Sequence, residues 1–435
     1  MKKNKLSFQR ADISHVRSLS FLLVTLLMLS CSTPKNDQVT ANYVSIGFLS
    51  AVVYEPPQTV QKSDIGIVVM HSHGDYMGFI ANSELAQRGF TVIATAPNSS
   101  DFIESKVLSV KNLVGYLRSR KDINKVVLLG HSGGATVMTA YALLAEQGRA
   151  ALEGKIYQDY SDKILELPKI DGLLLLDANP GLSTVMLNSI DPNVTDETRG
   201  LGTVEKFTED DQQTFMHAQR DRYMKLVRQA QARLEVIKAG KGNFEDDEPF
   251  VIPGAASGRM FNRLYTSDVN LLSHTKGEWP LIHADGSVTT EQVHSVRAPF
   301  NTHFGTSRLS VAVTTTVRSF LSTYAMNVDE DYAVLEDGFQ GIQFDSNLTS
   351  PIGNIKGVTV PSLFMGMTGS YEYLSSEAIY NNSPAADKTL AFVEGASHMF
   401  GPDPQAEKYN NADYGDTVKN LFDYVAQWLN GKDRF

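Results

Sequence analysis

The sequence has little that could cross-link the chain or attract nucleic acid. Among 435 residues there is one cysteine, Cys31, so no disulfide can form within one chain and the fold must rest on its core. Acidic residues outnumber basic ones by 49 to 39, and a net charge of -10 argues against nucleic acid or an anionic membrane surface as a partner. The chain also has no glycine-rich phosphate loop, no basic cluster and no internal repeat.

The apolar stretch near the N-terminus is short. Phe21–Leu29 cannot span a bilayer as a mature helix, but it suits the centre of an export signal, and basic residues precede it. Cys31 follows directly, which resembles a bacterial lipoprotein cleavage site, where the cysteine becomes lipidated. We therefore expect a signal peptide over 1–31, a polar tether over 32–42, and a cell-envelope lipoprotein in the periplasm or on the cell surface. The lipid on Cys31 would be the one membrane contact, and ordinary secretion is the alternative.

Buried strands alternate with helices at both ends of the chain. A continuous apolar run is typical of a strand covered on both faces, and Ile65–Met70 is such a run. Further strands are predicted at 90–96, 126–129, 170–176, 358–365 and 389–393. Amphipathic patterns predict helices near 80–88, 103–118 and 417–429, and the stretch 43–54 reads as one or two opening strands. This alternation predicts an α/β fold with a mostly parallel sheet flanked by helices.

The alternation breaks between residues 182 and 357. We expect long helices at 215–239 and 310–326 there, with charged or glycine- and proline-rich loops between them. We therefore divide the chain into a core, 43–181 and 358–435, and a large, mainly helical cap, 182–357, inserted after the sixth strand. Because the chain returns to the same sheet, we expect the insertion to cover the strand ends.

The strongest chemical signal is Gly130-His131-Ser132-Gly133-Gly134, which follows an apolar strand and precedes a helix-forming run. This is a G-x-S-x-G motif in strand–turn–helix context. Such a turn is sharp, needs small neighbours, and presents the serine hydroxyl above a helix N-terminus. We interpret Ser132 as a nucleophile, with a purely structural turn as the alternative.

Partners for Ser132 are expected at the carboxyl ends of the strands. His398 follows the last predicted strand, and its imidazole can take the serine proton and return it to the leaving group. A carboxylate should orient this histidine. We favour Glu372, which lies beyond the strand at 361–366, and Asp177, at the end of the strand after the nucleophile helix, is the alternative.

The loop after the first buried strand permits two interpretations. In the first, an oxyanion is stabilised by the backbone N–H groups of Gly133 and Asp75. In the second, His71, His73 and Asp75 form an H-x-H-x-D metal motif, although Tyr76 stands where binuclear metallo-hydrolases normally have another histidine. We prefer the oxyanion interpretation and keep a metal-dependent hydrolase as an alternative.

These motifs resemble those of the α/β-hydrolase superfamily. Gly130–Gly134 is similar to its nucleophile elbow, Ser72–Gly74 to its oxyanion loop and Gly395–His398 to its histidine loop, and the order serine, acid, histidine also matches. The resemblance covers roughly residues 43–181 and 358–435. It therefore implies an α/β-hydrolase fold for the core.

The acid is where the sequence departs from the family pattern. The usual G-x-x-D after the penultimate strand would place the acid at Gly369, so Glu372 requires a small insertion in that loop. Some relatives, such as the platelet-activating-factor acetylhydrolases, take the acid one strand earlier, and Leu176-Asp177 is similar to that arrangement.

The resemblance implies a serine hydrolase. Ser132 would attack a carbonyl, and water would then deacylate the serine through His398. We expect a small-molecule carboxylic ester as the substrate, and a bulky or lipophilic one is consistent with a large cap and export. Amide or peptide cleavage on the same residues is the second hypothesis, and a surface-anchored, non-catalytic binding protein on a hydrolase scaffold is the third. A serine nucleophile argues against dehalogenase or epoxide-hydrolase chemistry, and no metal or organic cofactor is implied.

Overall fold

The computed structural model describes residues 37–192, 194, 197, 212–255, 268–299 and 312–435. The predicted signal peptide and Cys31 lie outside these residues. Residues Asn36–Phe435 form one compact unit, so the predicted core and cap pack together. No helix in the described ranges combines the length and apolar character needed to cross a bilayer.

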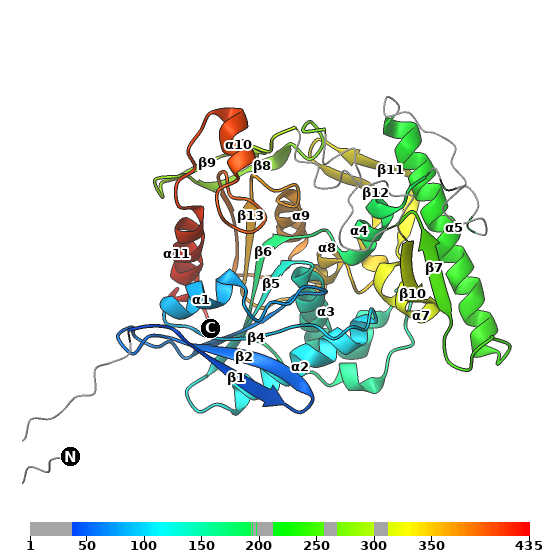
Figure 1. Ribbon diagram of the computed structural model, residues 1–435, viewed down its shortest axis with the longest axis horizontal. Coiled ribbons are helices and arrows are strands. Elements are labelled where there is room, and N and C mark those ends of the chain that lie inside the picture. The colour runs from blue at the N-terminus through cyan, green and yellow to red at the C-terminus, as the bar shows by residue number, and fades with distance from the viewer. Residues whose placement is uncertain (1–36, 193, 195–196, 198–211, 256–267, 300–311) are drawn as a thin grey trace, which may run out of the picture. The chain divides into compact units, whose positions relative to one another are not determined.

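A ten-stranded sheet runs through this unit in the order β1-β2-β4-β3-β5-β6-β13-β14-β8-β9 (Figure 1). The pairs from β4 to β8 along this order are parallel, whereas β1–β2, β2–β4 and β8–β9 are antiparallel. The predicted fold class, a mostly parallel sheet, is therefore confirmed. The strands are β1 Thr40–Ile46, β2 Leu49–Glu55, β3 Ile65–Met70, β4 Thr91–Thr95, β5 Lys125–Ser132, β6 Gly172–Ala178, β8 His274–Ile282, β9 Val288–His294, β13 Ser362–Met367 and β14 Lys388–Val393. β1 begins inside the stretch predicted as a tether.

Helices cover both faces of the sheet. Ile67 and Val69 of β3 pack with α1 and α11, whereas Val68 and Met70 pack with α2 and α3. All six residues of β3 are consequently buried, which explains its unbroken apolar sequence. The helices of the core are α1 Ile80–Gln87, α2 Ile103–Ser119, α3 Gly134–Gln147, α9 Leu374–Asn382, α10 Pro404–Asn410 and α11 Thr417–Leu429.

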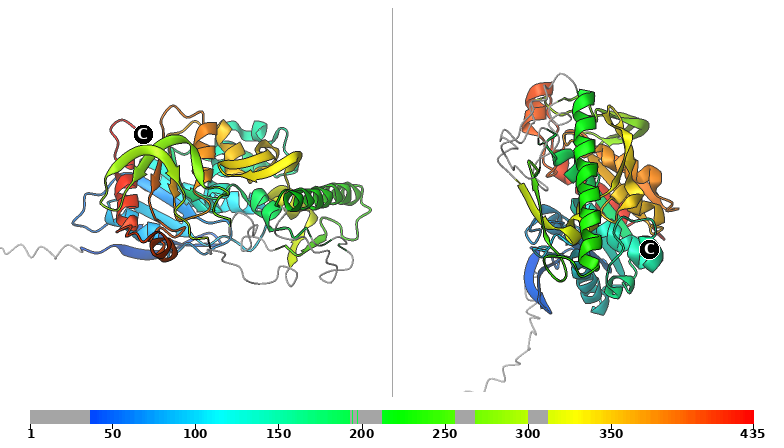
Figure 2. Two further views of the ribbon diagram at one scale, coloured as in Figure 1. Left: turned by 90° about the horizontal axis from the view of Figure 1, so that it is seen from above. Right: turned by 90° about the vertical axis from the view of Figure 1, so that its right-hand side faces the viewer.

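The insertion after β6 contains strands as well as helices. Its long helix α5 is confirmed and lies along the outer side of the insertion (Figure 2). The helices are α4 Leu182–Ser189, α5 Gln212–Lys238, α7 Val317–Ser319 and α8 Pro351–Asn354, and two antiparallel pairs join β7 Pro249–Pro253 to β10 Ala312–Thr316 and β11 Asn327–Leu335 to β12 Gly338–Gln343. The short helical turns of the insertion are η5 Phe320–Tyr324, η6 Phe344–Ser346 and η7 Ile355–Gly357, whereas η1 Gly148–Leu152 and η2 Asp162–Leu165 precede β6.

The helix predicted over 310–326 is wrong in its first half. Ala312–Thr316 forms strand β10, and helical turns extend only from Val317 to Tyr324. The sequence of β10 is rich in β-branched residues, which favour a strand, and it pairs with β7. The hydroxyl of Thr316 then accepts a hydrogen bond from the N–H of Ser319 and caps the following turn.

The insertion also lengthens the central sheet. β8 pairs in parallel with β14, and β9 forms the edge beyond it. The sequence did not predict these strands, because β8 contains Gly277 and Pro280 and β9 is almost entirely exposed. Part of the 182–357 segment is therefore an extension of the core sheet.

Candidate active site

Ser132 lies at the sharp turn between β5 and α3. Its φ of 51° places it in the left-handed region, which a serine rarely adopts. A Cβ atom on Gly130 would lie 2.7 Å from the Cα of Ala135, and one on Gly134 would lie 2.8 Å from the carbonyl oxygen of Met70. The two motif glycines are therefore required by the close approach of β3 and α3 to this turn.

His398 lies in the loop after β14, where it meets two carboxyl groups. Its Nδ1–H donates to Oδ2 of Asp177 at 2.6 Å, whereas Oε2 of Glu372 lies 3.6 Å from the same nitrogen. Asp177 is fully buried, and its other oxygen accepts the backbone N–H of Met367 at 3.0 Å. The structure thus brings together Ser132, His398 and both candidate acids, with Asp177 in hydrogen-bond contact and Glu372 beside it.

Glu372 and His398 shift each other's pKa, and the charge of Asp177 acts on both. Burial raises the pKa of Glu372 to about 7, with the charge of Asp177 adding to the rise, while His398 and hydrogen bonds with Ser132 and Tyr371 oppose it. Burial lowers the pKa of His398, but the charges of Glu372 and Asp177 and the hydrogen bond to Asp177 outweigh it and raise this pKa to about 9. The proton affinities of Glu372 and His398 therefore depend on each other.

His131 links the loop of His398 to the loop of Tyr76 through hydrogen bonds. The sequence did not predict this role. Its Nε2–H donates to the backbone carbonyl of His398 at 2.7 Å, and its Nδ1 accepts from the hydroxyl of Tyr76 at 2.6 Å. The side chain is buried, which holds the pKa of His131 well below its usual value and keeps the ring neutral. Nothing in the local motif could reveal this, because both partners come from other loops.

The side chains of the H-x-H-x-D motif do not converge. Nδ1 of His71 accepts backbone N–H groups of His73 and Gly74 at 3.0 and 2.7 Å, and Oδ1 of Asp75 accepts the N–H of Met77 at 2.9 Å. These atoms are therefore engaged with their own loop. Within the described ranges, the group of three acidic or histidine side chains whose ligand atoms lie within 4.8 Å of one another is Asp177, Glu372 and His398.

The loop after β3 approaches the elbow from the other side. A Cβ atom on Gly133 would collide with the hydroxyl of Ser72, which hydrogen-bonds to Nδ1 of His73 at 3.0 Å. The backbone N–H of Asp75 has no acceptor among the residues that the structure describes. A glycine at position 133 thus lets this loop lie against the elbow, and the Asp75 N–H is left available.

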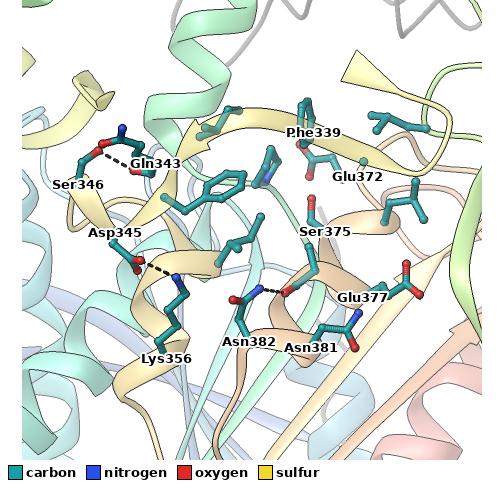
Figure 3. Close-up of a pocket in the computed structure, with 18 of the residues that line it drawn as sticks. Phe339, Gln343, Asp345, Ser346, Lys356, Glu372, Ser375, Glu377, Asn381 and Asn382 are labelled. Atoms are coloured by element: carbon teal, nitrogen blue, oxygen red, sulfur yellow. Dashed lines mark hydrogen bonds and ion pairs between the residues drawn. The ribbon is translucent and has the colours of Figure 1, made fainter. Parts of the chain in front are cut away.

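A cavity of about 610 Å³ adjoins the cluster (Figure 3). Its wall combines the β11–β12 hairpin, α9 and the loop that carries Glu372. Apolar side chains dominate one part of it, namely Pro180, Val185, Phe339, Ile342, Phe344 and Leu374. The cavity therefore connects an apolar space to a residue that contacts both Ser132 and His398.

The cations in the cavity wall are offset by carboxylates. Lys356 pairs with Asp345 at 2.5 Å, as Figure 3 shows, and Lys276 lies 3.8 Å from Asp337. The carboxylate of Glu377 accepts two backbone N–H groups and the indole N–H of Trp279. With more carboxylates than cations, this lining suits an uncharged group better than an anion.

No protein-family model matches this chain, and no curated protein matches it. Among solved structures, it is similar to Est1E from Butyrivibrio proteoclasticus, at 10% identity and a TM-score of 0.39, over 89% of this chain and 98% of that one. It is also similar to a proline iminopeptidase from Mycobacterium smegmatis (13%, 0.38, 90% and 97%) and to a hormone-sensitive lipase from a metagenome library (11%, 0.41, 92% and 88%). These likenesses are too distant to assign an activity. The mostly parallel sheet, the elbow at Ser132 and the histidine loop after β14 themselves give the chain the α/β-hydrolase fold.

Proposed function

We propose that the protein is a serine hydrolase that cleaves a carboxylic ester of a small, uncharged molecule. The observation that carries this proposal is the buried Asp177 carboxylate hydrogen-bonded to His398, beside a serine in a strained strand–turn–helix elbow. Backbone strain of this kind is retained at functional sites because it presents a reactive group.

The proposed reaction assigns one role to each group. As the Ser132 oxygen bonds to the ester carbonyl carbon, His398 takes the hydroxyl proton, and the N–H groups of Gly133 and Asp75 donate to the carbonyl oxygen. The carbon–oxygen bond to the alcohol then breaks, and His398 returns the proton to that alcohol. Water repeats the sequence on the acyl-serine, while Asp177 orients the imidazole throughout. The same groups could cleave an amide, which is the second candidate.

The purified protein is expected to hydrolyse p-nitrophenyl butyrate and to react covalently with a fluorophosphonate probe. Both reactions require an activated serine hydroxyl, so peptide mapping by mass spectrometry should find the adduct on Ser132. Activity should also persist in EDTA, because no step uses a metal. Absence of both hydrolysis and labelling would favour the binding-protein hypothesis, and activity lost in EDTA and restored by zinc would favour the metal-dependent one.

We further propose that the cavity beside Glu372 receives an apolar part of the ester. Replacing Ile342 by tryptophan should fill this space and lower the ratio of kcat/KM for p-nitrophenyl octanoate to that for the acetate by about 10-fold, since each buried methylene contributes roughly 0.8 kcal/mol. Leu335→Trp is the matched control, because Leu335 lies on the same hairpin, is 38% exposed and does not line the cavity. An unchanged ratio in Ile342→Trp, or an equal change in the control, would place the acyl group elsewhere.

A further inference from the structure

The site contains one carboxyl group more than a serine triad needs. Asp177 takes the N–H of His398 at 2.6 Å, while Oε2 of Glu372 lies only 3.6 Å from the same nitrogen. One N–H can make one strong hydrogen bond, so the second carboxyl group is not required to orient the ring. Glu372 nevertheless also reaches the Ser132 hydroxyl.

The surroundings of Glu372 favour a proton on its carboxyl group. The residue is 2% exposed, and its Oε2 has no hydrogen-bond partner among the described residues. The groups that face it are Asp177, His398, Ser132, Tyr76 and Tyr371, and His398 is the one among these that can become a cation. Two buried carboxylates beside a neutral imidazole would repel each other, so ionised Glu372 and protonated His398 are coupled.

The position of one proton then has chemical consequences. With Asp177 ionised, this proton can lie on Glu372, which leaves His398 neutral, or on His398, which leaves Glu372 ionised. The two arrangements carry the same net charge, and they interconvert by moving one proton between neighbouring groups. Only the first leaves an imidazole that can accept the proton of Ser132.

We propose that Glu372 is a positioning residue that exchanges a proton with His398 and thereby sets the pH at which His398 can act as the base for Ser132. This inference rests on the proposed function and deepens it. In acylation the serine proton moves to His398 and then to the alcohol, while the proton on Glu372 stays there. When Glu372 is ionised, its charge holds the proton on His398 up to a higher pH, and the serine remains unactivated below that pH.

Other groups near His398 do not offer this control. His131 lies beside it with ring centroids 4.5 Å apart, but it is buried and donates to the His398 carbonyl. His71 also faces His398, but burial lowers the pKa of His71 to about 3. The ring of Tyr371 stacks on that of His398, with the ring centroids 6.5 Å apart. Asp177 is held in place by two hydrogen bonds, one with His398 and one with the backbone N–H of Met367.

The test compares Glu372→Gln with the wild-type full chain. Glutamine has the size of a protonated glutamate and cannot ionise, so the pKa of His398 should fall by about one unit or more. Titration of the His398 ring by NMR, with 13C-labelled histidine and assignment through a His398→Asn variant, measures this without any substrate. The acid limb of the kcat/KM profile for p-nitrophenyl butyrate, expected near pH 9 in the wild type, should move down equally.

Glu394→Gln is the control variant. Glu394 lies in the same loop as His398, but its carboxylate pairs with His283 at 2.7 Å, so the pKa of His398 should not change. If Glu372→Gln does not fold, Glu372→Met supplies an uncharged side chain of similar length. A His398 pKa that stays the same in the folded variant, or a loss of activity that is equal at every pH, would overturn this inference. A shifted pKa without ester hydrolysis would overturn the proposed function instead.

Discussion

Ser132→Ala is expected to lower kcat for p-nitrophenyl butyrate by about 10⁶-fold, the loss found when the nucleophile of a serine protease is removed. Alanine keeps the size of the elbow residue, so the sheet and helix around it should fold unchanged. His398→Ala should lower kcat to about the same residual value, and the kcat of the double variant should be no lower than that of either single variant. Such non-additivity arises because the serine and the histidine act as one unit.

The measurement is kcat of each variant. As a control for folding, the unfolding temperature of the variant should lie within about 3 °C of the wild-type value. Alanine also lacks the hydroxyl that a fluorophosphonate needs, so labelling of the Ser132→Ala protein should disappear. Retention of more than about one per cent of the wild-type rate would show that another group performs the attack.

Asp177→Asn is expected to lower kcat about 10⁴-fold. The amide preserves the shape, but it can no longer hold the N–H tautomer of His398 with a negative charge, so the imidazolium formed during acylation is not stabilised. Glu372→Gln should lower kcat much less when each variant is measured at its own pH optimum. The reason is that Glu372 lies 3.6 Å from Nδ1 of His398 and does not accept the hydrogen bond of that nitrogen.

These two variants separate the candidate acids. The reverse order, with the larger loss in Glu372→Gln, would make Glu372 the orienting acid that the sequence pattern favours. Equal losses would mean that both carboxylates are needed for a single function. The expected order instead assigns orientation to Asp177 and proton control to Glu372.

The sequence predicts the parallel part of the fold well, because burial on both faces leaves an unmistakable pattern. The six buried residues of β3 and the amphipathic α11 lie where their patterns place them. The strands β8 and β9 were not predicted. An exposed edge strand needs no apolar face, so the sequence of β9 resembles an ordinary polar segment.

The site is predictable in its parts but not in its final contacts. Ser132 and His398 are marked by strand ends and small neighbours, which are local signals. The acid is not, because Asp177 at the end of β6 and Glu372 after the adjacent strand β13 both lie within 4 Å of the same imidazole nitrogen. About one ångström decides which carboxylate takes the hydrogen bond, and no sequence pattern specifies that distance.

Two strand pairs of the insertion lie in different places. Its β8–β9 pair is joined to the edge of the main sheet, whereas its β11–β12 hairpin forms a separate small sheet and supplies a wall of the cavity. Substitutions in that hairpin can therefore reshape the space for the substrate without altering the sheet that holds Ser132, Asp177 and His398. Under the proposed function, specificity and catalysis can therefore diverge independently in evolution, because residues of this hairpin change one wall of the cavity while the main sheet stays the same.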